Sequence, residues 1–152
     1  CMEEILERVM KEKFKMAYMD VAERFAQLSH AERAKVGAII VKEDRIISIG
    51  YNGMPQNMDN SCEEDGQTKP EVIHAEANAF AKMAQSNESC SGAVMFVTHF
   101  PCLHCAKQIV QSGISKVYYG RPYKAAVGSG EQLLSSSNVG VECVPIGTTS
   151  NI

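Results

Sequence analysis

The stretch that decides the fold runs from residue 93 to residue 120 and reads "AVMFVTHFPCLHCAKQIVQSGISKVYYG". Its first part, "AVMFVTH" (93–99), begins with five apolar residues and predicts a buried strand. Pro101 suits the first turn of a helix and Gly113 suits its end, and "SKVYYG" (115–120) predicts a second strand. A strand, a helix and a strand in this order predict two parallel strands joined by a right-handed crossover.

The same alternation continues toward the C-terminus, where residues 130–138 predict a helix and residues 139–146 a last strand. Upstream, residues 36–41 and 45–51 are β-branched runs joined by "KED", which predicts a hairpin. Because no internal repeat or linker divides the chain, we expect residues 1–152 to form a single α/β domain. In this domain the hairpin leads into a βαβαβ unit.

Three further segments complete the expected fold. Residues 3–28 predict one long amphipathic helix, because apolar residues recur there at steps of three and four. The recurring residues are Phe14, Ala17, Tyr18, Val21, Phe25 and Leu28. Residues 52–72 contain Gly, Pro, Asn and Asp with few apolar residues, and predict a long loop of the kind that is usually functional or disordered. "HAEANAFAKMAQ" (74–85) is apolar almost all round, so we expect a buried helix.

Composition narrows the classes of function. The 152 residues are 45% hydrophobic and 22% charged, with a formal net charge of −3. This charge argues against a nucleic-acid partner, which normally requires a basic patch. No apolar run approaches the roughly 20 residues that span a bilayer, and the N-terminal stretch is too charged for a secretory signal. We therefore expect a cytoplasmic protein without membrane contact.

Cys102 and Cys105 are the first candidates for a metal-binding or redox site in the sequence. The six cysteines, at positions 1, 62, 90, 102, 105 and 143, are scattered and do not suggest a disulfide framework. Cys102 and Cys105 are spaced i, i+3 at the start of a helix, so their sulfur atoms lie on one face. Taken alone, the pair fits a redox dithiol, part of a zinc site or two packed cysteines. A structural zinc site would need a second matched pair, and haem attachment would need a histidine where Ala106 stands.

A second motif upstream decides between these alternatives. "HAE" (74–76) begins the other predicted helix, and both helices can begin at the same end of one sheet. His74, Cys102 and Cys105 would then supply three zinc ligands and leave the fourth position open, as catalytic zinc sites do. Glu76 would lie over that open position without binding the metal. H-x-E followed by P-C-x-x-C is the pattern of zinc deaminases that act on cytosine or adenine.

The remaining histidines and cysteines receive plainer interpretations. His99 ends a strand near the expected site, and we interpret it as a pocket or packing residue. His104 points away from the ligand face and is expected at the surface or an interface. Cys62 and Cys90 lack flanking ligand-like spacing, so we do not expect them to hold a second metal.

Four motifs together resemble the deoxycytidylate (dCMP) deaminase family of the cytidine deaminase-like superfamily. They are "VGAIIV", "GYNGMP", "HAEANAF" and "FPCLHCAKQIVQSGISKVYY", and the resemblance runs from about residue 14 to 146. It implies a three-layer α/β/α sandwich around a five-stranded mixed sheet. It also implies zinc-dependent hydrolysis of dCMP to dUMP with release of ammonia, which would supply dUMP for thymidylate synthesis. Glu76 would then carry protons from water to ring N3 and to the departing amine.

Single residues separate this family from its neighbours. Deaminases of free cytidine carry Cys where His74 stands, and the acidic chain lacks the basic surface that a tRNA substrate requires. Asn78 and Asn52 also match the nucleotide enzymes, and Asn52 resembles the residue that hydrogen-bonds the nucleoside. The chain departs from the family at "LSHAERAKVG" and at "QNMDNSCEEDGQTKP".

We expect the substrate to meet residues on several of these segments. The expected substrate-binding residues are Asn52, Ala75, Pro101, Lys35, Arg121 and Lys124. The basic members, together with Arg33, are candidates for the 5′-phosphate. Arg121 and Lys124 follow a parallel strand at its carboxyl end, where such folds bind ligands.

Assembly and regulation are expected from the resemblance. Apolar residues at the start of the first helix suggest a partner surface, and the family forms homo-oligomers, commonly hexamers. These residues are Ile5, Leu6, Val9 and Met10. Many members are activated by dCTP and inhibited by dTTP. We place a possible effector site in the loop at Gly53, Met54, Glu63 and Asp65, where Glu64 and the other acidic residues would hold Mg²⁺ with a triphosphate.

Overall fold

A computed structural model of the chain describes residues 10–122 and 130–147. Its centre is a sheet of five strands in the order β2-β1-β5-β6-β7. The strands are β1 (Gly37–Lys42), β2 (Arg45–Tyr51), β5 (Val94–His99), β6 (Lys116–Arg121) and β7 (Gly140–Cys143). β1 pairs antiparallel with both β2 and β5, whereas β5, β6 and β7 run parallel. The sheet is therefore mixed, as the hairpin and the βαβαβ unit predicted.

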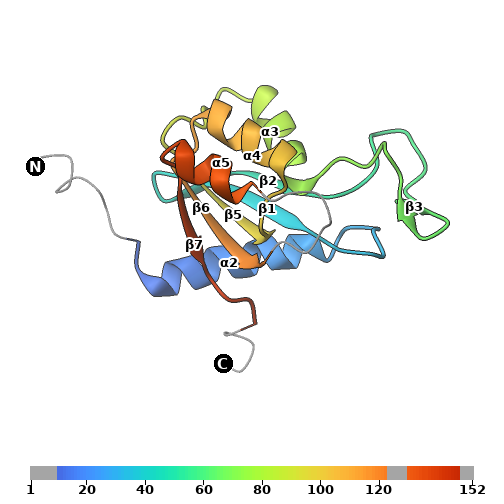
Figure 1. Ribbon diagram of the computed structural model, residues 1–152, viewed down its shortest axis with the longest axis horizontal. Helices are drawn as coiled ribbons and strands as arrows, with labels where there is room; N and C mark the ends of the chain where they lie inside the picture. The colour runs from blue at the N-terminus through green and yellow to red at the C-terminus, as the bar shows by residue number, and fades with distance from the viewer. Residues whose placement is uncertain (1–9, 123–129, 148–152) are drawn as a thin grey trace, which may run out of the picture.

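Helices cover both faces of the sheet (Figure 1). One face carries α2 (Glu12–Ala26). The other carries α3 (Ala75–Ala84), α4 (Leu103–Ser112) and α5 (Glu131–Ser136). The expected three-layer α/β/α sandwich is confirmed, and the expected helix at 130–138 and strand at 139–146 are each shorter in the structure.

The first helix differs from its prediction. Lys11 has an extended backbone (φ −68°, ψ 146°) and precedes the first turn of α2, so the helix does not continue through Met10 and Lys11. Met10 is half-buried and packs against the core on the α2 face instead of forming part of an exposed apolar patch. Ile5, Leu6 and Val9, which completed the expected partner surface, lie outside the described residues.

The apolar residues that predicted α2 are also not the ones that it buries. Phe14 and Leu28 are 48% and 45% exposed, while the buried stripe consists of Lys15, Met19, Ala22 and Ala26. Gly37 of β1 explains this orientation, because a Cβ there would lie 2.0 Å from the carbonyl oxygen of Ala22. The helix approaches β1 so closely at this point that small side chains, those of Ala22 and Ala26, must face the strand there.

The segment between β2 and α3 is more ordered than a plain loop. It contains a small hairpin formed by β3 (Glu63–Glu64) and β4 (Gln67–Thr68). Asp65 and Gly66 connect the two strands, and both have positive φ (53° and 76°). This is the geometry of a type I′ turn, which Asp-Gly favours. The backbones of Gly53 and Ile73 also exchange two hydrogen bonds, which close the segment at its base.

Two apolar clusters form the core, one on each face of the sheet. On the α2 face, the rings of Phe96 and Tyr118 stack at 4.5 Å. α3 lies on the opposite face but is less buried than predicted, since Ala81, Lys82 and Ala84 are exposed. In the part of the chain that the structure describes, no helix combines the length and apolar character needed to cross a bilayer.

Candidate active site

Two helices begin at the same end of the sheet and carry the motifs that the sequence singled out. His74 is the N-cap of α3 and Cys102 is the N-cap of α4, and both have extended backbones. Pro101 therefore precedes the helix rather than forming its first turn. Cys105 lies in the first turn of α4, on the same side as Cys102, and Gly113 ends the helix in the left-handed conformation (φ 89°).

Close packing fixes the start of α3 against the sheet. A Cβ on Gly50 of β2 would lie 2.4 Å from the carbonyl oxygen of Ala75 and 2.6 Å from the amide nitrogen of Ala79. Asn78 adds a hydrogen bond of 2.8 Å from its side-chain amide to the carbonyl of Tyr51. The backbone that carries His74 and Glu76 is thus seated on the end of β2.

His74, Cys102 and Cys105 converge as the sequence predicted. The Nδ1 atom of His74 lies 3.3 Å from the sulfur of Cys105 and 3.5 Å from that of Cys102. Zinc bonds of about 2.3 Å to sulfur and about 2.0 Å to nitrogen place such atoms about 3.5 Å apart in a tetrahedral site. All three donor atoms lie within 4.8 Å of one another, and no other such group of histidine, cysteine or acidic side chains occurs in the described residues. The donor set fits zinc.

The electrostatics of the cluster favour a cation. A hydrogen bond from Cys105, supported by one with His74, lowers the pKa of the Cys102 thiol to about 3. The hydrogen bond with Cys102 raises the pKa of His74. The same thiol–thiolate bond raises the pKa of Cys105, because the sulfur pair holds one proton in common. Since thiolates are the sulfur ligands of zinc, the cluster is prepared for a positively charged ion.

Glu76 lies beside this cluster and is only 4% exposed. Burial raises the pKa of its carboxyl group to about 7, although its own backbone amide and nearby His74 act in the opposite direction. No ion pair with a Lys or Arg of the described residues holds its charge. A carboxyl group that titrates near neutrality is suited to accept and return a proton.

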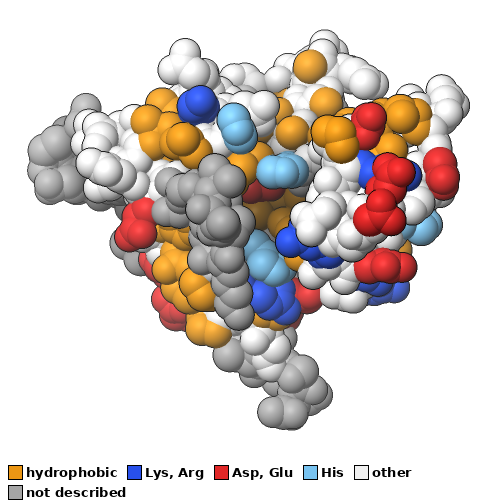
Figure 2. All heavy atoms as spheres, turned by 45° about the vertical axis from the view of Figure 1, so that its right-hand side comes forward, with side chains coloured by type: hydrophobic (Ala, Val, Ile, Leu, Met, Phe, Trp, Pro, Cys, Tyr) orange, Lys and Arg blue, Asp and Glu red, His pale blue; other side chains and the backbone are white. Residues whose placement is uncertain are grey.

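A cavity of about 370 Å³ opens over His74, Glu76 and Cys102. This volume lies in the range of small-molecule sites. Figure 2 shows histidine side chains around a hollow on this face, with acidic side chains gathered on one side of it. The remaining lining residues are Ala31, Arg33, Ala34, Val36, Asn52, Cys62, Glu63, Thr68, Val72, Ala75, His99, Phe100 and Pro122.

Comparison with known proteins identifies the family. Residues 12–121 match the model of the cytidine and deoxycytidylate deaminase zinc-binding region. The chain belongs to this deaminase family. It is 47% identical to the dCMP deaminase of cyanophage S-TIM5, whose structure in complex with dCMP and dUMP superposes with a TM-score of 0.85 over 89% of this chain and 99% of that one.

Curated relatives agree with this placement. The chain is 32% identical to deoxycytidylate deaminase of Enterobacteria phage T4, over 84% of this chain and 88% of that protein. It is 41% identical to the human deoxycytidylate deaminase, over 67% of this chain and 61% of the human protein. The deaminase thus shares with these enzymes the region that carries its His-Cys-Cys cluster.

The substrate-binding residues predicted from the sequence fall at different places in the deaminase. Asn52 and Ala75 line the cavity, whereas Pro101 is fully buried behind it. Both polar atoms of the Asn52 side chain already form hydrogen bonds within the protein. The oxygen accepts one from the Val36 amide at 2.9 Å, and the nitrogen donates one to the Ala34 carbonyl at 2.8 Å. Asn52 therefore fixes the cavity wall in addition to lining it.

The basic candidates for a phosphate are also separated. Lys35 is exposed and does not line the cavity. Arg121 forms an ion pair of 2.9 Å with Glu23 of α2, and Lys124 lies outside the described residues. Arg33, the remaining candidate, lines the cavity.

The four effector candidates lie at two places along the segment between β2 and α3. The backbone of Gly53 is hydrogen-bonded to that of Ile73, and Asp65 lies in the turn of the β3–β4 hairpin. Glu63 lines the cavity, and its carboxylate accepts hydrogen bonds from the backbone amides of residues 32 and 33. Met54 is half-buried, and its backbone lies near the thiol of Cys62.

Several lining residues were not predicted from the sequence. Cys62, Thr68 and Val72 all belong to the 52–72 segment, where Asp65-Gly66 was an available signal for a hairpin that folds back. His99 lines the cavity, as its interpretation as a pocket residue proposed, and His104 is exposed. Cys90 is buried in the core of the α3 face.

Proposed function

We propose that this deaminase hydrolyses dCMP to dUMP and ammonia. The observation that carries the proposal is the buried carboxyl of Glu76 beside a zinc-compatible His-Cys-Cys cluster at the floor of a cavity. The assignment of dCMP as the substrate is supported by the named relatives, one of which was solved with dCMP and dUMP. One water is consumed for each ammonia released.

His74, Cys102 and Cys105 would hold the zinc ion. When bound, zinc supplies a water molecule whose pKa is lowered toward 7. Glu76 would accept a proton from that water and deliver it to ring N3 of the pyrimidine, which makes C4 more electrophilic. As the water oxygen forms its bond to C4, the same carboxyl group would take the remaining hydroxyl proton and pass it to the amine when the C4–N bond breaks. Because its pKa lies at about 7, Glu76 is able to take up and release the proton at neutral pH.

Release of ammonia from a substrate panel tests the proposal. The panel contains dCMP, deoxycytidine, cytosine, dCTP and a tRNA, assayed with purified protein of measured zinc content. We expect about one zinc per chain, loss of activity on chelation, and turnover of dCMP well above that of the other compounds. Equal turnover of dCMP and deoxycytidine would refute the nucleotide assignment. Full activity in zinc-free protein would refute the metal.

Assembly and regulation enter as proposals from the family resemblance. We propose that the chain forms homo-oligomers of hexameric size, that dCTP with Mg²⁺ activates it, that dTTP inhibits it, and that its product dUMP serves thymidylate synthesis. Light scattering tests the assembly, and a sigmoidal dCMP rate curve that dCTP makes hyperbolic and dTTP depresses tests the regulation. A monomer with hyperbolic kinetics that neither triphosphate changes would refute the proposed assembly and regulation.

A further inference from the structure

One wall of the cavity is a segment without regular secondary structure that side chains from elsewhere hold in place. It covers residues 29–36, between α2 and β1, and contributes Ala31, Arg33, Ala34 and Val36 to the lining. Ser29 fixes its start, donating to the Asn52 carbonyl at 2.7 Å and accepting from the Ala31 amide at 3.1 Å. Asn52 fixes its end through Ala34 and Val36.

Glu63 fixes the middle of this wall from the β3–β4 hairpin. Its Oε1 atom accepts hydrogen bonds from the backbone amides of Glu32 (2.7 Å) and Arg33 (3.1 Å), and its Oε2 atom lies 3.3 Å from the Glu32 amide. These bonds join residues about thirty positions apart in the sequence. Hydrogen bonds from backbone amides to a carboxylate are charge-assisted and strong.

The segment of residues 29–36 places one positively charged side chain at the cavity. Arg33 is the one Lys or Arg among the described lining residues. Its guanidinium donates to the hydroxyl of Thr68 at 3.3 Å, and no carboxylate of the described residues forms an ion pair with it. Arg121, by contrast, is paired with Glu23. A guanidinium that is bonded to a neutral hydroxyl keeps its charge and most of its N–H donors available for an anion.

We propose that Arg33 binds the 5′-phosphate of the substrate and that Glu63 is the positioning residue that holds Arg33 in place. The inference rests on the proposed function, because a phosphate on the substrate is what Arg33 recognises. Glu63 acts through the backbone of residues 32 and 33, and Thr68 orients the guanidinium. The β3–β4 hairpin thereby becomes part of the apparatus that selects a nucleotide over a nucleoside.

One substitution of Glu63 separates its role as a hydrogen-bond acceptor from the effect of its negative charge. Both short bonds of Glu63 end on one oxygen, Oε1, so Glu63→Gln retains an acceptor for both amides, whereas Glu63→Ala removes it. The neighbouring Glu64 is exposed on the same hairpin, and Glu64→Gln serves as a control for the loss of one negative charge.

Steady-state kinetics with dCMP and deoxycytidine test the proposal, with calorimetric binding of dUMP and deoxyuridine as a readout independent of turnover. We expect Arg33→Ala to raise KM for dCMP and Kd for dUMP on the order of 10–100-fold and to reduce the preference for dCMP over deoxycytidine by a similar factor. Glu63→Ala should raise both constants about 3–10-fold, while Glu63→Gln restores most of the affinity. Arg33→Ala/Glu63→Ala should bind dUMP no more weakly than Arg33→Ala alone.

The proposal is overturned if Arg33→Ala weakens dUMP and deoxyuridine equally, if Glu63→Gln binds as weakly as Glu63→Ala, or if the two alanine substitutions act additively. Failure of the wild-type protein to deaminate dCMP is a separate result, which would refute the proposed function itself. Circular dichroism of Glu63→Ala establishes that its loss of affinity occurs in folded protein.

Discussion

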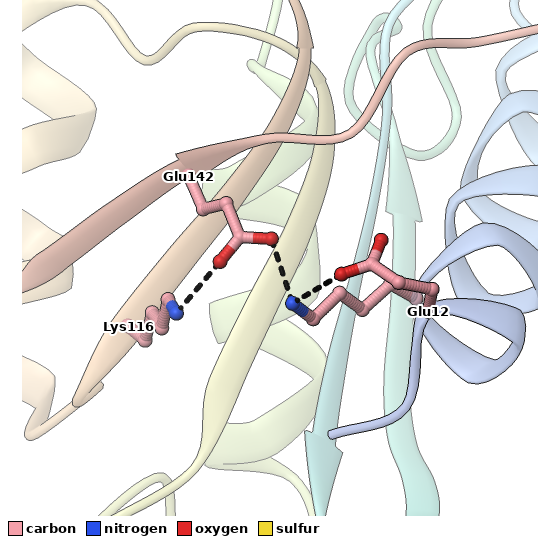
Figure 3. A network of polar contacts seen from close by, with 4 residues as sticks. Glu12, Lys116 and Glu142 are labelled. Carbon is pink, nitrogen blue, oxygen red and sulfur yellow. Dashed lines mark hydrogen bonds and ion pairs between the residues drawn. The ribbon is translucent and has the colours of Figure 1, made fainter. Parts of the chain in front are cut away.

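Lys15 and Glu76 are both buried ionisable side chains, and they lie on opposite faces of the same sheet. Lys15 is 7% exposed and Glu76 is 4% exposed. The ammonium group of Lys15 lies 2.8 Å from Glu142 and 3.0 Å from Glu12, and Lys116 completes the network through a 3.0 Å contact with Glu142 (Figure 3). Glu76 has no ion-pair partner of this kind in the described residues. One buried charge is compensated, and the other is not.

The consequence appears in the pKa values. The hydrogen bond with Glu142 raises the pKa of Lys15, so the lysine stays charged throughout the physiological range. The hydrogen bond with Lys15 in turn lowers the pKa of Glu142. Burial instead raises the pKa of Glu76 to about 7, which allows it to change protonation state in its working range. The ion pairs of Lys15 keep its charge fixed, which suits a structural role. Glu76 has no such ion pair with the described residues, so its carboxyl group is able to exchange a proton.

The largest expected effect comes from removing the reactive group. Glu76→Gln keeps the side-chain volume but removes the titratable oxygen, and we expect kcat for dCMP to fall about 10²–10⁴-fold. Melting temperature should not fall, because the buried side chain no longer has a charge to desolvate. Zinc content serves as the control and should stay at the wild-type level. Residual activity above one tenth of wild type would assign the proton transfer to another group.

Displacing Glu76 without changing it should have the next largest effect. The added methyl group of Gly50→Ala would collide with backbone atoms at the start of α3, so the helix has to move. We expect kcat to fall about 10–100-fold and the free energy of unfolding to fall by about 1–3 kcal/mol. Gly53→Ala is the matched control, since a Cβ there meets nothing within 4 Å. Similar kinetics for the two variants would show that the seating of α3 does not matter.

Breaking the compensated network should affect stability and not chemistry. Lys15→Met removes two charge-assisted hydrogen bonds but also the cost of burying an ammonium group, so we expect urea unfolding to show a loss of about 1–2 kcal/mol. Turnover of dCMP should stay within twofold of wild type. Lys13→Met, an exposed position on the same helix, should change stability by less than about 0.5 kcal/mol. A loss of turnover in Lys15→Met would contradict the structural role.

The smallest expected effect is a dependence of this stability difference on pH. The lowered pKa of Glu142 means that its contribution is complete above its unfolded pKa of about 4.3 and is lost as pH falls through its lower folded value. The raised pKa of Lys15 leaves its contribution intact at any pH below about 10. The difference in unfolding free energy between wild type and Lys15→Met should thus be constant from pH 6 to 9 and shrink below pH 4. A difference that does not begin to shrink below pH 4 would place the stabilisation elsewhere.

Local spacing predicted much of this molecule. The hairpin of β1 and β2, the parallel unit from β5 to β7 and the convergence of His74, Cys102 and Cys105 all follow from patterns within short stretches. Those patterns set which strands are neighbours and where helices begin, and the metal cluster is built on two helix starts.

What could not be predicted depends on contacts between distant segments. Lys15 is classed by its type as a surface residue, yet Glu142, 127 positions away, makes its burial favourable. The orientation of α2 follows from Gly37 on another element, so the large apolar residues Phe14 and Leu28 misidentified its buried face. Glu63 was expected to bind a cation because it lies in an acidic run, and its hydrogen bonds to the amides of residues 32 and 33 could not be predicted, since backbone amides carry no sequence signal.

The cavity wall of residues 29–36 has a consequence for how this deaminase changes over time. Apart from Ser29, Arg33 and the buried Ala31, its side chains are exchangeable, because Ser29, Asn52 and Glu63 hold its backbone. The metal ligands and Glu76 belong to other segments and are seated independently of it. Substitutions at positions 30 to 35 are therefore able to alter what the enzyme accepts without disturbing its proton transfer. A library randomised at these few positions offers a compact starting point for evolving new pyrimidine selectivity.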